Sequence, residues 1–172
     1  MKTVFLKRMA IVIIAVATMS VSAAAQKQGE MAAGANLLFG TTSGYSNVGL
    51  GAKFLYNVTD PIRLSGEFDY FLKSNYVNYY DFSVYGHYLF PVAEKIVAYP
   101  EVGLGVLGST VSFPTIPGWG TPNSASGSDF ALSIGGGADY ALSPNLTLNA
   151  GLRLKLVSGS WFNIFAGIAY KF

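Results

Sequence analysis

Hydrophobic and polar residues alternate along most of the chain, in eight windows of about ten residues each. One parity of each window carries Leu, Ile, Val, Phe and Tyr, and the other carries Gly, Ser, Asn and the charged residues. Because successive side chains of a strand point to opposite faces of its sheet, this period of two predicts β-strands with one apolar face. The expected strands are residues 31–40, 48–57, 62–72, 80–90, 96–107, 129–140, 146–156 and 161–172.

The links between these strands alternate in length. Short turns with proline, at 57–61, 91–95 and 141–145, alternate with links at 41–47, 73–79, 109–128 and 158–160. Residues 109–128 contain three prolines and several glycines, which break regular structure. Tight turns at one rim and mostly longer loops at the other are typical of transmembrane barrels, with the turns in the periplasm and the loops outside the cell. An even number of strands then places both termini in the periplasm.

The N-terminal residues have the pattern of an export signal. Three basic residues precede or flank the start of an apolar stretch at 9–21, and the three alanines at 23–25 match a small-x-small cleavage site. The apolar stretch is too short for a comfortable membrane-spanning helix, which argues against the alternative of an uncleaved anchor. We therefore expect a cleavable signal peptide at 1–25 and a barrel domain at 26–172.

The composition argues against an ordinary soluble enzyme. Hydrophobic residues make up 51% of the chain and charged residues only 12%, about half the roughly 25% usual in soluble domains. The absence of Cys excludes disulfides and thiolate metal sites. Removal of the signal takes away three of eleven basic residues and leaves eight basic against nine acidic groups, a net charge of −1. This balance gives no basis for nucleic-acid binding.

Glycines and aromatic residues indicate which face of the sheet meets lipid. Nine glycines share the polar parity, which suits a narrow lumen where small and large side chains interleave. Aromatic residues lie near strand ends on the apolar parity, where interfacial girdles belong. A soluble barrel of lipocalin type, with the apolar parity inside, is the alternative, but glycine weakens a solvated strand. The prediction is an all-β fold, an eight-stranded antiparallel up-and-down transmembrane β-barrel.

Charged residues of the predicted strands all lie on the polar parity and are expected to form a lumenal charge network. They are Lys53, Arg63, Glu67, Asp69, Asp81, Glu101, Asp129, Asp139, Arg153, Lys155 and Lys171. Five basic and six acidic groups can neutralise one another in a filled barrel, because eight strands leave an interior just wide enough for side chains. The expected pairs join Arg63, Arg153 and Lys155 with Glu67, Glu101 and Asp139. A narrow polar conduit is the alternative.

The chain offers few groups for catalysis or metal binding. His87 is the single histidine, and Ser83 precedes it by four residues on the same face of a strand. At about 3.4 Å per residue the two are separated by roughly 13 Å, well beyond hydrogen-bond reach. Asp69, Asp81 and Asp129 could meet near the extracellular rim and hold Ca²⁺ through oxygen ligands, but no loop has the spacing of an EF-hand. We expect no enzyme activity, no cofactor and no metal.

The end of the chain carries a localisation motif. Phe172 is the last residue, and Tyr170 and Ile168 precede it by two and four places. This run resembles the C-terminal signal of bacterial outer-membrane proteins. With the signal peptide and the eight strands, the chain resembles the small outer-membrane β-barrels of the OmpA/OmpX type in their single-domain form. The resemblance implies a place in the bacterial outer membrane, contact with its lipids, and recognition of the last strand by the barrel-assembly machinery.

A structural or surface-interaction role is the function these features predict, with extracellular loops presented from a largely filled barrel. Loop 109–128 carries Phe113, Ile116 and Trp119, which could contact an extracellular partner or fold over the barrel mouth. One alternative is a narrow, porin-like channel for small solutes or ions. A more distant alternative is an outer-membrane lipid-modifying enzyme. We expect a monomer.

Overall fold

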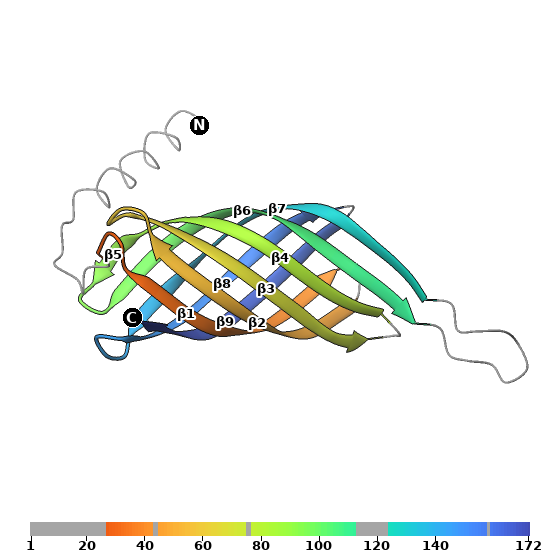
Figure 1. The fold of residues 1–172 in the computed structure, drawn as a ribbon, viewed down its shortest axis with the longest axis horizontal. Helices are drawn as coiled ribbons and strands as arrows, with labels where there is room; N and C mark the ends of the chain where they lie inside the picture. Colours follow the sequence, from red (N-terminus) through yellow and green to blue (C-terminus); the bar gives the residue numbers. More distant parts are fainter. Residues whose placement is uncertain (1–26, 43–44, 75–76, 113–123, 158) are drawn as a thin grey trace, which may run out of the picture.

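The computed structural model describes residues 27–42, 45–74, 77–112, 124–157 and 159–172, and these fold into one closed β-barrel (Figure 1). The strands are β1 (Met31–Thr42), β2 (Tyr45–Asn57), β3 (Ile62–Ser74), β4 (Val77–Tyr88), β5 (Phe90–Ala93), β6 (Ile96–Ser112), β7 (Ser124–Ala141), β8 (Leu146–Val157) and β9 (Gly159–Lys171). Within these described ranges, no helix is long and apolar enough to cross a membrane.

Neighbouring strands pair antiparallel all the way around the barrel. The order is β4-β3-β2-β1-β9-β8-β7-β6-β5, and an additional pairing of β4 with β6 closes the ring. Both β4 and β5 pair with β6, one after the other, so they act as a single spanning strand interrupted at Leu89. The barrel therefore has eight spanning strands, as the alternation predicts. The first described residues, before β1, and Phe172 lie at the same end of the barrel, where the Phe172 N–H donates to Met31 O.

The apolar parity faces outward. Leu50, Phe82 and Val102 expose 57%, 59% and 60% of their surface on the outside of the barrel, while their polar-parity neighbours in the strand are mostly buried inside. A continuous belt of exposed apolar side chains is stable in contact with lipid and unfavourable in contact with water. The soluble, lipocalin-like alternative is therefore wrong for this chain.

Several strands extend further than the alternation indicates. Both ends of the link expected at 109–128 are strand, because β6 continues to Ser112, β7 begins at Ser124, and these two residues are paired. Figure 1 shows the paired ends of β6 and β7 projecting at the right beyond the other strands, at the opposite end from the C-terminus. Outside the membrane both faces of a hairpin meet water, so backbone pairing continues there without apolar alternation. Phe113, Ile116 and Trp119 lie outside the described residues.

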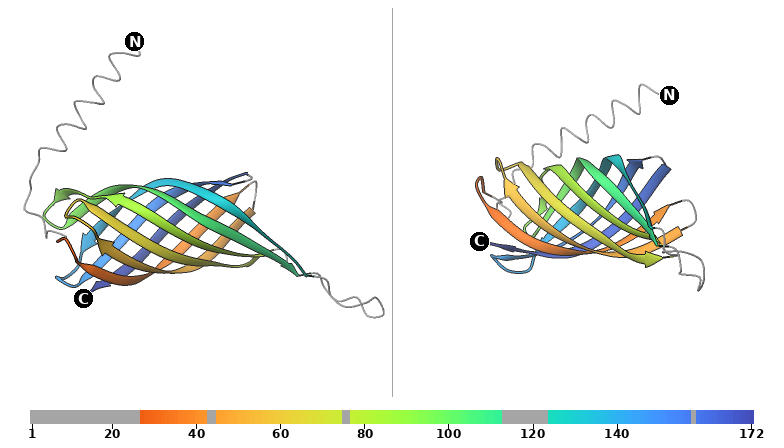
Figure 2. Two further views of the ribbon diagram at one scale, coloured as in Figure 1. Left: turned by 45° about the horizontal axis from the view of Figure 1, so that its top comes forward. Right: turned by 45° about the vertical axis from the view of Figure 1, so that its right-hand side comes forward.

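The turn expected at 91–95 is also shorter than predicted. Residues Phe90–Ala93 form β5, and only Glu94 and Lys95 make the turn. Pro91 sits within this short strand, which is paired with β6 alone, and an edge position of this kind tolerates the missing proline N–H. The views in Figure 2 show the strands wrapping around the barrel with a common tilt.

Candidate functional site: the barrel interior

Glycines on the inner face make room for large side chains. A Cβ added to Gly103 would overlap the ring of Tyr85, and one added to Gly137 would meet the ring of Tyr99. Gly51 similarly accommodates the carboxylate of Asp69 from the neighbouring strand. Small and large residues therefore alternate around the lumen, so that the barrel is filled by its own side chains.

Arg153 on β8 is the centre of the buried ion network. Its Nε donates to Glu101 Oε1 at 2.5 Å, and its two terminal nitrogens donate to the Glu67 carboxylate at 2.6 and 2.9 Å. The guanidinium carbon also lies 3.9 Å from the ring centroid of Tyr85 and 4.3 Å from that of Phe165. Two carboxylates and two aromatic faces thus replace water around one cation.

Arg63 on β3 forms a second group nearer the periplasm. Its guanidinium pairs with Asp139 at 2.5 Å and donates from Nε to His87 Nδ1 at 2.9 Å. The His87 ring stacks on Tyr99 with centroids 4.8 Å apart, and His87 Nε2 lies 3.2 Å from Glu101 Oε2. Glu101 therefore connects the Arg63 group with the Arg153 group.

Lys155 has a partner that the sequence does not predict. Its Nζ lies 2.5 Å from Asp81 Oδ1, an oxygen that also accepts a hydrogen bond from Ser83 at 2.6 Å. Asp69 lies directly opposite Asp81 in the pairing of β3 with β4. Among the described residues, neither carboxylate oxygen of Asp69 has a hydrogen-bond partner, and the residue is fully buried. Lys155 pairs with Asp81 because strand tilt, which parity alone does not reveal, sets the depth of each side chain.

The remaining predicted lumenal charges lie in different surroundings. Lys53 is buried, and its Nζ donates to Asn36 Oδ1 at 2.8 Å. Lys171 is half-buried at the periplasmic end, where its Nζ lies 3.2 Å from Glu30 Oε1. Asp129 is exposed on the projecting part of β7, so it does not belong to the buried network. Strand β7 continues beyond the barrel at that point, which a parity count does not detect.

An apolar cluster fills the extracellular end of the lumen, and sequence reasoning missed it. It consists of Leu38, Phe71, Leu107, Trp161 and Phe165, with Tyr79 and Val157 packed against it. The Trp161 ring lies 5.1 Å from Phe71 and 4.8 Å, edge-on, from Tyr79. Large apolar residues on the otherwise polar parity are the signal that could have indicated this inner cluster.

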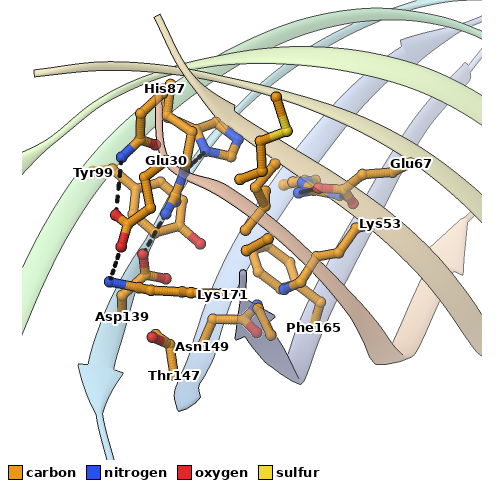
Figure 3. Close-up of a pocket in the computed structure, with 17 residues that line it drawn as sticks. Glu30, Lys53, Glu67, His87, Tyr99, Asp139, Thr147, Asn149, Phe165 and Lys171 are labelled. Atoms are coloured by element: carbon orange, nitrogen blue, oxygen red, sulfur yellow. Dashed lines mark hydrogen bonds and ion pairs between the residues drawn. The ribbon is translucent and has the colours of Figure 1, made fainter. Parts of the chain in front are cut away.

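A small cavity remains at the periplasmic end of the lumen (Figure 3). It contains about 20 Å³ of free space, roughly enough for one water-sized particle. Figure 3 shows Lys53, Asn149 and Thr147 on one part of its wall, and the pair of Glu30 and Lys171 on another. The interior therefore has an apolar extracellular end, a charged middle and a small polar vestibule at the periplasmic end.

The interior offers no catalytic or metal-binding arrangement among the described residues. The Ser83 hydroxyl donates a hydrogen bond to Asp81, whereas His87 Nδ1 accepts one from Arg63, so the two are not a nucleophile and its base. In the same part of the chain, no three His, Asp or Glu side chains are grouped so that they could hold a metal ion. Asp69 and Asp81 are neighbours, but Asp129 lies apart from them on the exposed end of β7.

Comparison with known proteins identifies the family to which this β-barrel belongs. The family model for the outer membrane protein beta-barrel domain matches residues 11–172. Neisserial surface protein A (NspA) is similar in structure with a TM-score of 0.66 and 18% identity, covering 83% of this chain and 96% of that chain. Ail, the attachment invasion locus protein of Yersinia pestis, gives 0.59 and 20% identity, with 84% and 99% covered. No curated protein sequence matches significantly.

A third similar structure is the N-terminal β-barrel domain of Pseudomonas aeruginosa OprF, with a TM-score of 0.56 and 16% identity, covering 84% of this chain and 100% of that chain. The TM-scores of these three structures show a common fold, and the family match extends over nearly all of the chain. The chain belongs to the outer membrane protein beta-barrel domain family and is a bacterial outer-membrane β-barrel with periplasmic termini.

Proposed function

We propose that this protein acts at the cell surface, presenting the β6–β7 hairpin from a barrel closed by its own side chains. The observation that carries the proposal is the length of this hairpin. Strands β6 and β7 have 17 and 18 residues, and their pairing continues to Ser112 and Ser124. The described pairing of β7 with β8 starts only at Leu132. The hairpin thus projects from the barrel as a two-stranded extension (Figure 2).

The extension has the surface of a contact element. Residues 125–130 of β7 are all exposed, and serine, alanine and glycine make up most of this stretch, so a partner can approach its backbone closely. We propose that Phe113, Ile116 and Trp119, in the segment that connects the two strands, supply apolar anchors for an extracellular partner. Aromatic anchors surrounded by polar residues are common at protein interfaces.

A similar structure supports an extracellular ligand. Ail is named an attachment invasion locus protein, and one structure holds it with sucrose octasulfate, a heparin analogue. Ligand binding by a barrel of this size therefore has a precedent. We do not propose an anionic ligand of this kind for the present chain, because its described extracellular part carries Asp129 and no basic cluster.

The filled interior favours surface presentation over transport. The Arg153 network and the apolar cluster around Trp161 occupy successive levels of the lumen. The small periplasmic cavity is the observation that favours the second candidate, a narrow channel for small solutes or ions. The arrangement of His87 and Ser83 supports a protein without enzymatic activity.

The proposal includes how the protein reaches the membrane. We propose that residues 1–25 are a cleaved signal peptide, that the mature chain 26–172 is a monomer surrounded by outer-membrane lipids, and that the barrel-assembly machinery recognises its last strand. Ile168 and Tyr170 on the outer face of β9, and Phe172 directly after it, support this recognition, because 41%, 57% and 67% of their surface is exposed.

Adhesion of bacteria that display the protein tests the surface role. A non-adherent laboratory strain carrying the intact protein is applied to immobilised extracellular-matrix proteins and to cultured epithelial cells. We expect adhesion above the empty strain, and its loss when residues 111–125 are replaced by a two-residue turn or when Phe113, Ile116 and Trp119 are all changed to alanine. The matched control, Ser143→Ala in the periplasmic turn, should adhere normally. Equal adhesion by the empty strain and the strain with intact protein would refute the proposal.

A further inference from the structure

We propose that Asp69, inside the barrel, is a proton-binding site that holds one proton at neutral pH. Its carboxyl group is then a neutral acid and not a carboxylate, and the barrel takes up this proton when it folds. The site is independent of the surface role proposed above, because Asp69 lies on the inner face of β3 and not on the extension formed by β6 and β7.

The Asp69 carboxyl group has no partner in its surroundings. The residue is fully buried, and neither of its oxygens has a hydrogen-bond partner among the described residues. Its Oδ1 fills the space over Gly51, and Leu38 of the apolar cluster borders the same space. An ionised carboxylate in this position would have neither water nor a donor around it, which is costly. A neutral acid avoids most of this cost.

The cations near Asp69 are engaged by other carboxylates. The charged side chains that interact with it most strongly are Glu67, Lys155, Arg153 and Asp81. Arg153 binds Glu67 with two hydrogen bonds, and Lys155 Nζ lies 2.5 Å from Asp81 Oδ1. Asp81 is also directly opposite Asp69 in the pairing of β3 with β4, where Cβ atoms are about 4.5 to 5.5 Å apart. A negative charge on Asp69 would therefore be repelled by two carboxylates, and a proton removes that charge.

The buried charges of the interior balance only when one proton is added. Buried charged side chains of the described residues comprise four basic and five acidic groups. They are Lys53, Arg63, Arg153 and Lys155, and Glu67, Asp69, Asp81, Glu101 and Asp139. His87 adds no positive charge, because its Nδ1 accepts a hydrogen bond from Arg63 Nε and therefore carries no proton. The interior thus has one acidic group in excess. Asp69 is the member without a partner, so the balancing proton belongs there.

A proton suits this position better than a metal cation. A metal ion of the Ca²⁺ or Mg²⁺ type needs several oxygen ligands. Among the described residues, no three His, Asp or Glu side chains are grouped so that they could hold one. A proton needs a single carboxylate oxygen and no further space. Since an exposed aspartate ionises near pH 3.9 (about the value in model peptides), the unfolded chain lacks this proton at neutral pH. Folding should therefore take it up.

Infrared spectroscopy of the folded protein detects the acid directly, because the C=O band of a carboxylic acid is separate from carboxylate bands and shifts in D₂O. The mature protein is measured at neutral pH in a detergent without carbonyl groups. We expect one carboxylic acid band. Asp69→Asn should remove it, and the matched control Asp60→Asn, at an exposed position before β3, should leave it in place.

The wild-type spectrum alone can refute the site, so the test stands even if the substitution prevents folding. Absence of the band from the wild-type protein would overturn the proposal, and an ionised Asp69 with a bound metal cation would give this result. Persistence of the band in folded Asp69→Asn would overturn it as well.

Proton uptake during folding provides an independent measurement. Protein unfolded in urea is diluted into the same detergent at neutral pH, in a weak buffer that contains a pH indicator. The wild-type protein should take up about one proton more per molecule than Asp69→Asn, because only its folded state binds the additional proton. Asp60→Asn should match the wild type. Equal uptake by the wild-type protein and folded Asp69→Asn would refute the site.

Discussion

Arg153 shows how a single residue can organise the interior of a membrane barrel. Its guanidinium group contacts Glu67 and Glu101 through four hydrogen bonds and is covered by the rings of Tyr85 and Phe165. Removing one member of such a buried group leaves buried charges without their counterion. The network therefore stabilises the barrel only when all its members are present, and its interaction energy cannot be assigned to a single ion pair.

Arg153→Met should destabilise the barrel by about 3 to 5 kcal/mol, the usual cost of breaking a buried ion pair. The reason is that Glu67 and Glu101 both lose their principal cation. Urea titration in detergent, followed by heat-modifiable gel migration, measures the change. The variant Arg153→Met combined with Glu67→Gln and Glu101→Gln should regain much of the loss, because no unpaired charge remains. If the triple variant is as unstable as the single one, packing of the arginine side chain dominates instead of charge.

Two glycines provide a matched test of the packing inside the barrel. Gly103→Ala places a methyl group against the Tyr85 ring on the inner face and should cost about 1 to 3 kcal/mol, typical of overpacking. Gly66→Ala meets nothing within 4 Å and should leave stability equal or slightly higher, because alanine loses less backbone entropy in a strand. The same urea titration compares them. Similar effects of both substitutions would contradict a tightly filled lumen.

Strand β9 combines a role in the finished barrel with a proposed role in assembly. Its end is held by the Phe172 N–H, which donates to Met31 O at 3.1 Å, and the Phe172 ring lies 6.4 Å from that of Phe54. With 67% of its surface exposed, the residue contributes less than the roughly 1.5 to 3 kcal/mol of a fully buried ring. Its importance should therefore appear mainly during assembly.

Deleting Phe172 should leave unassembled or degraded protein in cells, while the purified variant refolds in detergent with only slightly reduced stability. Heat-modifiable gel migration reports folding in both settings. The control is deletion of Gln28, an exposed residue near the start of the mature chain, and this variant should assemble normally. Normal assembly of the Phe172 deletion in cells, or equal failure in detergent, would show that this residue is not an assembly signal.

At the scale of the whole molecule, two layers of different chemistry close the lumen. The ion network around Arg153 fills the middle, and the cluster around Phe71 and Trp161 fills the extracellular end. A hydrated ion would have to displace both layers. In the proposed function, this closed barrel supports the β6–β7 hairpin.

Purified protein in planar lipid bilayers should therefore show no stable, large, ohmic single-channel currents. The control is a variant in which Trp161, Phe71 and Arg153 are all changed to alanine. This variant lacks the main blocking side chains of both layers, and its conductance should be higher than that of the wild-type protein if it remains folded. Steady large currents from the wild-type protein would contradict the closed lumen and favour the channel function.

The order of residues along the chain was enough to predict the fold because a strand in a membrane has only two faces. Alternation around Leu50 and Phe82 identified the lipid face, and the polar parity identified residues such as Arg63 and Arg153 that the structure buries inside. Eight windows of this kind require a closed barrel, since an open edge cannot be satisfied in lipid.

Tertiary structure alone decided how deep each inner residue lies, and therefore which partner a residue such as Lys155 takes. Strand tilt sets these depths, so Lys155 pairs with Asp81, and Phe71 meets Trp161 from a strand far along the chain. Apolar and polar residues stop alternating where a strand leaves the membrane. The continuation of β6 and β7 to Ser112 and Ser124 was therefore not predicted. Alternation reports the side of a strand that a residue occupies, whereas contacts inside a barrel depend on register and shear, which arise only when the sheet closes.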